Sequence, residues 1–90
     1  MAWKIEYTRT AVRELKSLDR QTVARIHKYL TETVVASEKP RAFGKSLSNN
    51  LSMYWRYRVG DYRLICDIQD EVLTVLVVKV GHRRLVYEKS

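Results

Sequence analysis

The sequence predicts an α+β domain made of an N-terminal strand, a helical hairpin and then an antiparallel β-meander with a short C-terminal tail. Apolar residues recur at spacings of three and four between positions 11 and 34, which is typical of amphipathic helices. Apolar and polar residues alternate just before that region and again after position 53, which is typical of half-buried strands. A chain of 90 residues suffices for one small domain, so we expect residues 1–90 to share a single core.

The first half of the chain predicts one strand and two helices. Trp3–Tyr7 alternates and is short, as a strand requires. Thr8 or Thr10 can cap the first helix, and Asp19 can cap the second. We expect the second helix to end before Pro40, because the residue before a proline is driven out of helical geometry.

A polar loop from about Ser37 to Ser52 leads into three predicted strands. These strands are expected at about Met53–Val59, Tyr62–Gln69 and Val72–Val80. Gly60-Asp61 is typical of a two-residue hairpin turn, because glycine supplies the positive φ that such a turn needs. The last strand is apolar on both sides, which places it in the middle of a sheet.

Charge is the strongest signal in the composition. Lys and Arg number 17 against 10 Asp and Glu, which leaves a net charge of +7. Between residues 40 and 63 the net charge is +4, so the excess is concentrated around the predicted hairpin. Such a patch can follow a nucleic-acid backbone or bind an acidic partner.

The alternation within the hairpin places its arginines on one face. Arg56 and Arg58 fall on the side opposite Trp55 and Tyr57, which we expect in the core with Tyr62. The two-residue turn places Arg58 directly across the ladder from Arg63. Like charges in that position destabilise a sheet, so we interpret the face as a site for an anion such as a phosphodiester.

Other kinds of chemistry find little support in the sequence. His27 and His82 lie far apart, without acidic or cysteine neighbours at ligand spacing, so no metal or cofactor is expected. There is no glycine-rich phosphate loop, nucleophile elbow or CxxC motif. The single cysteine, Cys66, lies within a predicted strand and is expected to be a small buried side chain. Without a secretory leader or an apolar run long enough for a membrane, we expect a cytoplasmic protein.

Two stretches, Leu51–Ile65 and Val80–Tyr87, resemble the RelE/ParE superfamily of bacterial and archaeal toxins. The predicted order of elements is similar to that family over nearly the whole chain, which implies a RelE-like, microbial-RNase-like fold. RelE-type members cleave mRNA in the ribosomal A site, whereas ParE-type members inhibit DNA gyrase. The resemblance to the RelE branch implies a catalytic set of Arg56, Arg63, Arg83 and Tyr87.

Within that set, the resemblance implies that Arg63 contacts the scissile phosphate and that Tyr87 is the general base or orients it. Arg56 stands where the family has one of two strand lysines, and Tyr54 replaces the other. Arg83 or His82 would assist the leaving oxygen. Further contacts to RNA are expected from Lys45, Tyr54, Arg58, His82 and Arg84.

The favoured function is therefore the toxin of a type II toxin–antitoxin system that acts as a ribosome-dependent mRNA endonuclease. RNA supplies its own nucleophile, the 2′-hydroxyl, so such a reaction needs no metal. The implied partners are a cognate RelB-like antitoxin, the ribosome with its rRNA, and mRNA, with operator DNA reached only indirectly through the antitoxin complex. Two alternatives stay open: a ParE-like gyrase inhibitor without catalysis, and a plain nucleic-acid-binding module.

Overall fold

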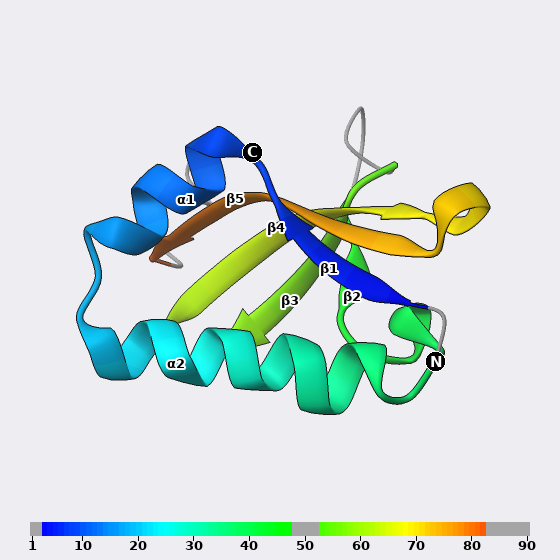
Figure 1. Ribbon diagram of the computed structural model, residues 1–90, viewed down its shortest axis with the longest axis horizontal. Helices are drawn as coiled ribbons and strands as arrows, with labels where there is room; N and C mark the ends of the chain where they lie inside the picture. The colour runs from blue at the N-terminus through cyan, green and yellow to red at the C-terminus, as the bar shows by residue number, and fades with distance from the viewer. Residues whose placement is uncertain (1–2, 48–52, 83–90) are drawn as a thin grey trace.

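The computed structural model describes residues 3–47 and 53–82, which form a five-stranded sheet and two helices (Figure 1). The strand order in the sheet is β1-β5-β4-β3-β2. This architecture confirms the α+β prediction. The strands are β1 (Lys4–Tyr7), β2 (Lys45–Ser46), β3 (Trp55–Val59), β4 (Tyr62–Gln69) and β5 (Thr74–His82).

Thr8 ends the first strand and begins helix α1 (Arg9–Lys16). Its hydroxyl oxygen accepts a hydrogen bond from the backbone N–H of Ala11 at 3.1 Å, as an N-cap should. The same hydroxyl donates to the carbonyl oxygen of Val78 on β5 at 2.9 Å. One side chain therefore starts the helix and ties it to the sheet.

Asp19 caps helix α2 (Arg20–Tyr29), with its carboxylate accepting from the backbone N–H of Thr22 at 3.1 Å. The helix continues through a π-helical segment, η1 (Leu30–Val35), and therefore ends before Pro40 as predicted. None of the helices in the described part of the chain has the length and apolar character to cross a membrane.

The three C-terminal strands form the predicted antiparallel meander. Arg58 pairs with Arg63 across β3 and β4, which confirms the predicted register. β5 pairs antiparallel with β4 on one side and parallel with β1 on the other, where Ile5 lies opposite Val75. The apolar strand thus lies inside the sheet, between β1 and β4, as its composition predicted.

Several boundaries differ from the sequence prediction, since β3 begins at Trp55 instead of Met53 and β5 ends at His82 instead of Val80. The expected loop contains a short 3₁₀ helix, η2 (Pro40–Ala42), and then β2, which pairs with β3 at the edge of the sheet. The last strand starts two residues later than expected, because η4 (Asp70–Val72) forms a turn of 3₁₀ helix and Leu73 adopts a positive φ of 48°. Local composition does not encode either feature.

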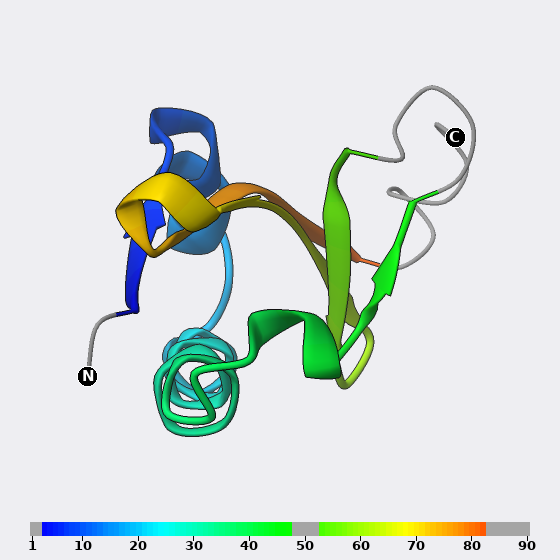
Figure 2. The same ribbon diagram turned by 90° about the vertical axis from the view of Figure 1, so that its right-hand side faces the viewer.

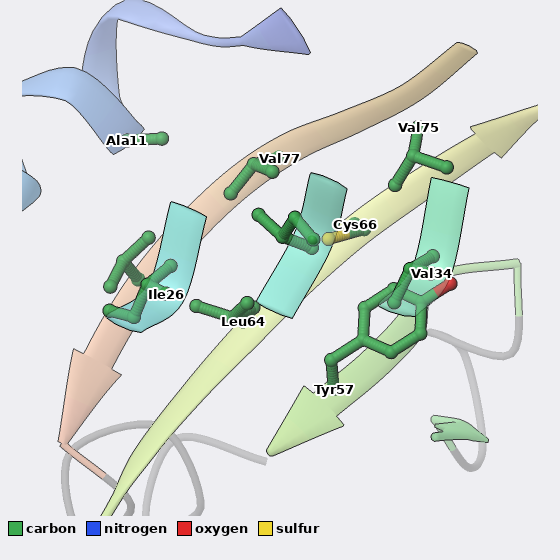
Figure 3. Close-up of a cluster of buried hydrophobic side chains, with 10 residues drawn as sticks. Ala11, Ile26, Val34, Tyr57, Leu64, Cys66, Val75 and Val77 are labelled. Atoms are coloured by element: carbon green, nitrogen blue, oxygen red, sulfur yellow. The ribbon is translucent and has the colours of Figure 1, made fainter. Parts of the chain in front are cut away.

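The sheet curves around α2, as Figure 2 shows in an end view. The core lies between the concave face of the sheet and this helix, where Ile26 packs with side chains from β3, β4 and β5 (Figure 3). Tyr57, Leu64 and Cys66 are fully buried there. Burial raises the pKa of the Cys66 thiol, so this cysteine is an inert core side chain, as predicted.

Candidate functional site

Four cations from three neighbouring strands lie on one face of the sheet. Lys45 on β2 pairs with Arg56 on β3, and Arg58 on β3 pairs with Arg63 on β4. Directly opposed residues in a ladder direct their side chains to the same face. Because Tyr57 alternates with the arginines and is buried in the core, this face points away from α2. We call these four residues the basic face.

The segment before β2 is fixed against β3 by aromatic side chains. The Tyr57 hydroxyl donates to the carbonyl oxygen of Pro40 at 2.6 Å, and Nε1 of Trp55 donates to the carbonyl oxygen of Phe43 at 2.5 Å. Gly44 follows with a φ of +70°, and a Cβ at that position would lie 2.2 Å from the carbonyl oxygen of Arg56. Only glycine allows this approach, which brings the next residue, Lys45, beside β3.

Arg63 is almost fully buried, with 4% of its surface exposed, whereas Arg58 opposite it is exposed. Nη1 of Arg63 donates to the carbonyl oxygens of Gly60 at 3.3 Å and Tyr62 at 3.2 Å. The guanidinium is therefore held against the β3–β4 turn, which orients it.

A cavity of about 250 Å³ adjoins the basic face. Its lining consists of Tyr29, Gly44, Lys45, Arg56 and Arg58. Among the described residues, three cations and no carboxylate line this space, so it favours an anionic group. The sequence analysis did not single out Tyr29, because it lies on α2 and only the folded chain brings it beside β3.

The remaining predicted site residues are placed differently. Tyr54 directly precedes β3 and is half-buried, and its carbonyl oxygen accepts from the backbone N–H of Leu47 at 3.1 Å. His82 pairs with Tyr62 across β4 and β5, and the two rings meet edge to face at 5.8 Å. Tyr62 and Arg63 are neighbours in β4, so their side chains point to opposite faces of the sheet. His82 shares the face of its partner Tyr62 and therefore lies on the face opposite the basic face. Arg83, Arg84 and Tyr87 lie outside the described residues.

Acidic side chains gather at the opposite end of β4. Asp67 lies near the end of that strand, and Asp70 follows it in η4, where its carboxylate receives two hydrogen bonds from Arg41 at 3.0 and 2.9 Å. These hydrogen bonds hold the pKa of Asp70 below its ordinary value. Three of the four acids among residues 53–82 therefore lie at the end of β4 opposite Arg63, whereas the fourth, Asp61, lies in the β3–β4 turn.

Comparison with known proteins gives the same family as the resemblance. A family model described as "ParE toxin of type II toxin-antitoxin system, parDE" matches residues 5–87. The chain belongs to the RelE/ParE superfamily of toxins. Toxin RelG of Mycobacterium tuberculosis is 32% identical over 89 residues, which cover 99% of this chain and 100% of RelG.

Solved structures agree with this assignment. The toxin–antitoxin complex RelBE2 from Mycobacterium tuberculosis contains a chain that matches with a TM-score of 0.81 and 31% identity, covering 92% of this chain and 93% of that one. The isolated E. coli RelE toxin matches with a TM-score of 0.72 and 25% identity, covering 98% of this chain and 94% of that one. This protein is thus a type II toxin with a RelE-like fold.

The described residues of this toxin contain no group of three His, Cys, Asp or Glu side chains that could hold a metal ion. Their chemistry consists of guanidinium, ammonium and phenol groups around the basic face. Such groups can bind a phosphodiester, stabilise added negative charge and stack on a base.

Proposed function

We propose that this toxin is a ribosome-dependent mRNA endonuclease that cleaves the message in the A site and so inhibits translation. The observation that carries the proposal is the basic face, where Lys45, Arg56, Arg58 and Arg63 share one side of three strands. Opposed like charges weaken a sheet unless something anionic binds between them. A ribose-phosphate chain supplies that charge at regular intervals.

In the proposed reaction the 2′-hydroxyl of RNA attacks the adjacent phosphorus. The P–O5′ bond breaks, which leaves a 2′,3′-cyclic phosphate and a free 5′-hydroxyl. The protein has to align the attacking and leaving oxygens and stabilise the charge that develops on the phosphate. Arg56 and Arg63 are proposed for this role, because a guanidinium stays protonated and binds two phosphate oxygens at once.

Two residues of the C-terminal tail complete the proposed set. Tyr87 would take the proton of the 2′-hydroxyl or orient the group that takes it, since nearby cations favour a deprotonated phenol. Arg83 would assist the leaving oxygen. His82 is left out of the proposed set, because its ring packs on Tyr62 on the other face of the sheet.

These arginines and Tyr87 include no strong acid or base at neutral pH. We therefore propose that the ribosome positions the message and supplies part of the proton transfer. A cognate antitoxin is the second proposed partner, with an acidic or amphipathic segment that covers the basic face and folds as it binds. The solved relatives include toxins in complex with antitoxins, such as RelBE2.

The proposal is tested by adding the purified toxin to a reconstituted translation system and mapping the ends of the message. We expect the wild-type toxin to cut within codons in the A site and Arg83→Ala to lose most of this cleavage. Arg9→Ala is the control, because Arg9 is an exposed residue of α1 away from the basic face. Intact message with wild-type toxin would contradict the proposal.

Inhibition of DNA gyrase is the second candidate function, because the matching family model is described as the ParE toxin. A gyrase inhibitor needs no nuclease chemistry, only a surface that binds the enzyme. Plasmid supercoiling by purified gyrase distinguishes the two functions. Loss of supercoiling together with intact message would favour the ParE-type activity.

A further inference from the structure

The outer edge of β3 is only partly covered by its neighbour. β2 pairs with β3 at Arg56 and Trp55, and the described pairs do not extend to Tyr57–Val59. That uncovered half of the strand ends beside α2 (Figure 1). The edge therefore opens toward the helix instead of toward another strand.

Two cavities follow this edge, one on each side of Tyr29. The first is the 250 Å³ cavity next to Lys45, Arg56 and Arg58. The second has a volume of about 380 Å³ and lies between Val59 and the α2 side chains Arg25 and Lys28. Tyr29 lines both cavities, and we call the two together the edge groove.

The edge groove continues the basic face. Arg56 and Arg58 belong to both, and Arg25 extends the positive charge past Tyr29, since its guanidinium lies beside the turn residue Gly60. Of the residues that the structure describes, five cations and one carboxylate, that of Glu32, line the two cavities together. This spacing of charge along a groove matches a chain of phosphates better than a single anion.

Tyr29 has the features of a stacking platform. The residue is half-buried, and its ring is held edge to face against Tyr57, with the centroids 6.1 Å apart. Burial raises the pKa of Tyr29, so its phenol is neutral at physiological pH and does not repel a phosphate. A fixed, neutral aromatic ring between cations is how proteins hold single-stranded nucleic acid without reading its sequence.

We propose that the edge groove binds the single-stranded RNA that flanks the cleaved phosphate, with Tyr29 stacking on a base and Arg25 and Lys28 contacting the phosphates beyond it. This proposal rests on the proposed function, because it takes the bound polymer to be RNA. It adds a second contact region on α2, which gives the RNA a path from the basic face across the edge of the sheet.

Binding of fluorescent oligoribonucleotides to the free toxin tests the groove. The probes are single-stranded, about three and about nine nucleotides long, and carry 2′-O-methyl riboses so that the proposed nucleophile is blocked. We expect wild-type toxin to bind the longer probe more tightly. Tyr29→Leu should lower the affinity for the longer probe about 10-fold, so that most of the difference in affinity between the two probes disappears. Tyr29→Phe should keep the wild-type affinity and the preference for the longer probe. Thermal melts of both variants separate loss of stacking from loss of fold.

The charge contacts have a matched control on the same helix. In a plot of the logarithm of the binding constant against the logarithm of salt concentration, Arg25→Gln should make the negative slope shallower by about 0.7, which corresponds to one phosphate contact to a single strand. Arg20→Gln should leave the slope unchanged, because Arg20 is exposed on α2 and lines neither cavity. Equal slopes for wild-type and Arg25→Gln would overturn the proposed path.

The results also separate this inference from the proposed function. If Tyr29→Leu and Arg25→Gln bind RNA as wild-type does while the wild-type toxin still cuts message on the ribosome, the groove fails and the nuclease stands. If they weaken RNA binding but no message is cut, the groove stands and the nuclease fails. If they weaken only the binding of an acidic peptide from the antitoxin, the groove is a peptide site and the inference is overturned.

Discussion

Arg58 and Arg63 face each other across β3 and β4, but their surroundings differ. Arg58 is exposed, so its charge is largely solvated. Arg63 is buried and donates hydrogen bonds to the carbonyl oxygens of Gly60 and Tyr62. The sequence pattern alone predicts that removing either arginine relieves repulsion. Because Arg63 is buried and hydrogen-bonded, we expect its removal to destabilise the fold instead.

We therefore predict opposite effects of the two substitutions on stability. Arg58→Ala should leave the free energy of unfolding unchanged or slightly higher, because a like-charge pair disappears. Arg63→Ala should lower it by about 1.5–3 kcal/mol, because a charged donor to two turn carbonyls is lost. Urea unfolding of both variants measures this difference. An equal effect of the two substitutions would show that the turn contacts contribute nothing.

Gly44 and Gly60 provide a second pair with a built-in control. Both have a positive φ, of 70° and 59°. A methyl group at Gly44 would meet the backbone oxygen of Arg56 at 2.2 Å, whereas one at Gly60 would meet only the flexible end of Arg25 at 3.3 Å. Gly60→Ala should therefore cost about 1–2 kcal/mol of backbone strain, and Gly44→Ala at least about 3 kcal/mol.

Chemical denaturation measures both losses. Because Gly44 positions Lys45, Gly44→Ala should also weaken binding of RNA to the folded protein. Similar stability losses for the two glycine variants would contradict the close approach between Gly44 and β3.

At the scale of elements, α2 depends on a cap that titrates. The hydroxyl and the backbone N–H of Thr22 both donate to Asp19, and these hydrogen bonds hold the pKa of Asp19 below its ordinary value of 3.8. A lowered folded-state pKa means that the carboxylate contributes its full stability above the unfolded value and loses it as the pH falls through the folded one.

We predict that Asp19→Asn is stable at neutral pH, because asparagine caps as well as aspartate does. Its stability should respond less than that of the wild-type protein to acid below pH 3.8. Thermal melts across that range, for both proteins, give the comparison. Parallel pH profiles would mean that the carboxylate of Asp19 adds nothing beyond the neutral cap.

Glu14 joins helix α1 to the part of β5 that lies beyond its pairing with β1. Its carboxylate accepts from the backbone N–H of Val80 at 2.6 Å and pairs with Lys79 at 3.0 Å. Glu14→Ala should lower the free energy of unfolding by about 1–3 kcal/mol, because it leaves the Val80 N–H without this acceptor. Glu14→Gln keeps an acceptor and should lose less than half as much, as equilibrium unfolding would show. A loss as large for Glu14→Gln as for Glu14→Ala would assign the stability to the ion pair instead.

The sequence predicts those elements whose signal is local. The caps at Thr8 and Asp19, the β3–β4 turn and the register of Arg58 with Arg63 all follow from short-range patterns. β2 does not, because its two residues become a strand only where Gly44 lets them approach β3. The burial of Arg63 and the position of Tyr29 beside β3 were equally hidden, since alternation gives the face of a side chain but not what lies against it.

At the scale of the described part of the molecule, a cluster of positive charge surrounds β3 and the neighbouring part of α2. The net charge is +7, and the basic face and the edge groove place five cations and a buried arginine near the β3–β4 turn. Apart from Asp61 in the β3–β4 turn, the described acids of the meander lie at the other end of β4, where Asp70 is paired with Arg41. Repulsion within this cluster opposes folding, and a bound polyanion would offset it.

This arrangement predicts that sodium chloride acts in opposite directions on folding and on binding. Salt screens the repulsion within the basic face, because the Debye length falls to about 10 Å at 0.1 M. The midpoint of thermal unfolding of the free toxin should therefore rise with added salt, while its affinity for single-stranded RNA falls. Arg58→Gln should show a smaller rise in the midpoint, because it removes one member of the opposed pair. A midpoint that falls with salt, or that rises equally in the variant, would show that repulsion between Arg58 and Arg63 does not limit the stability of the fold.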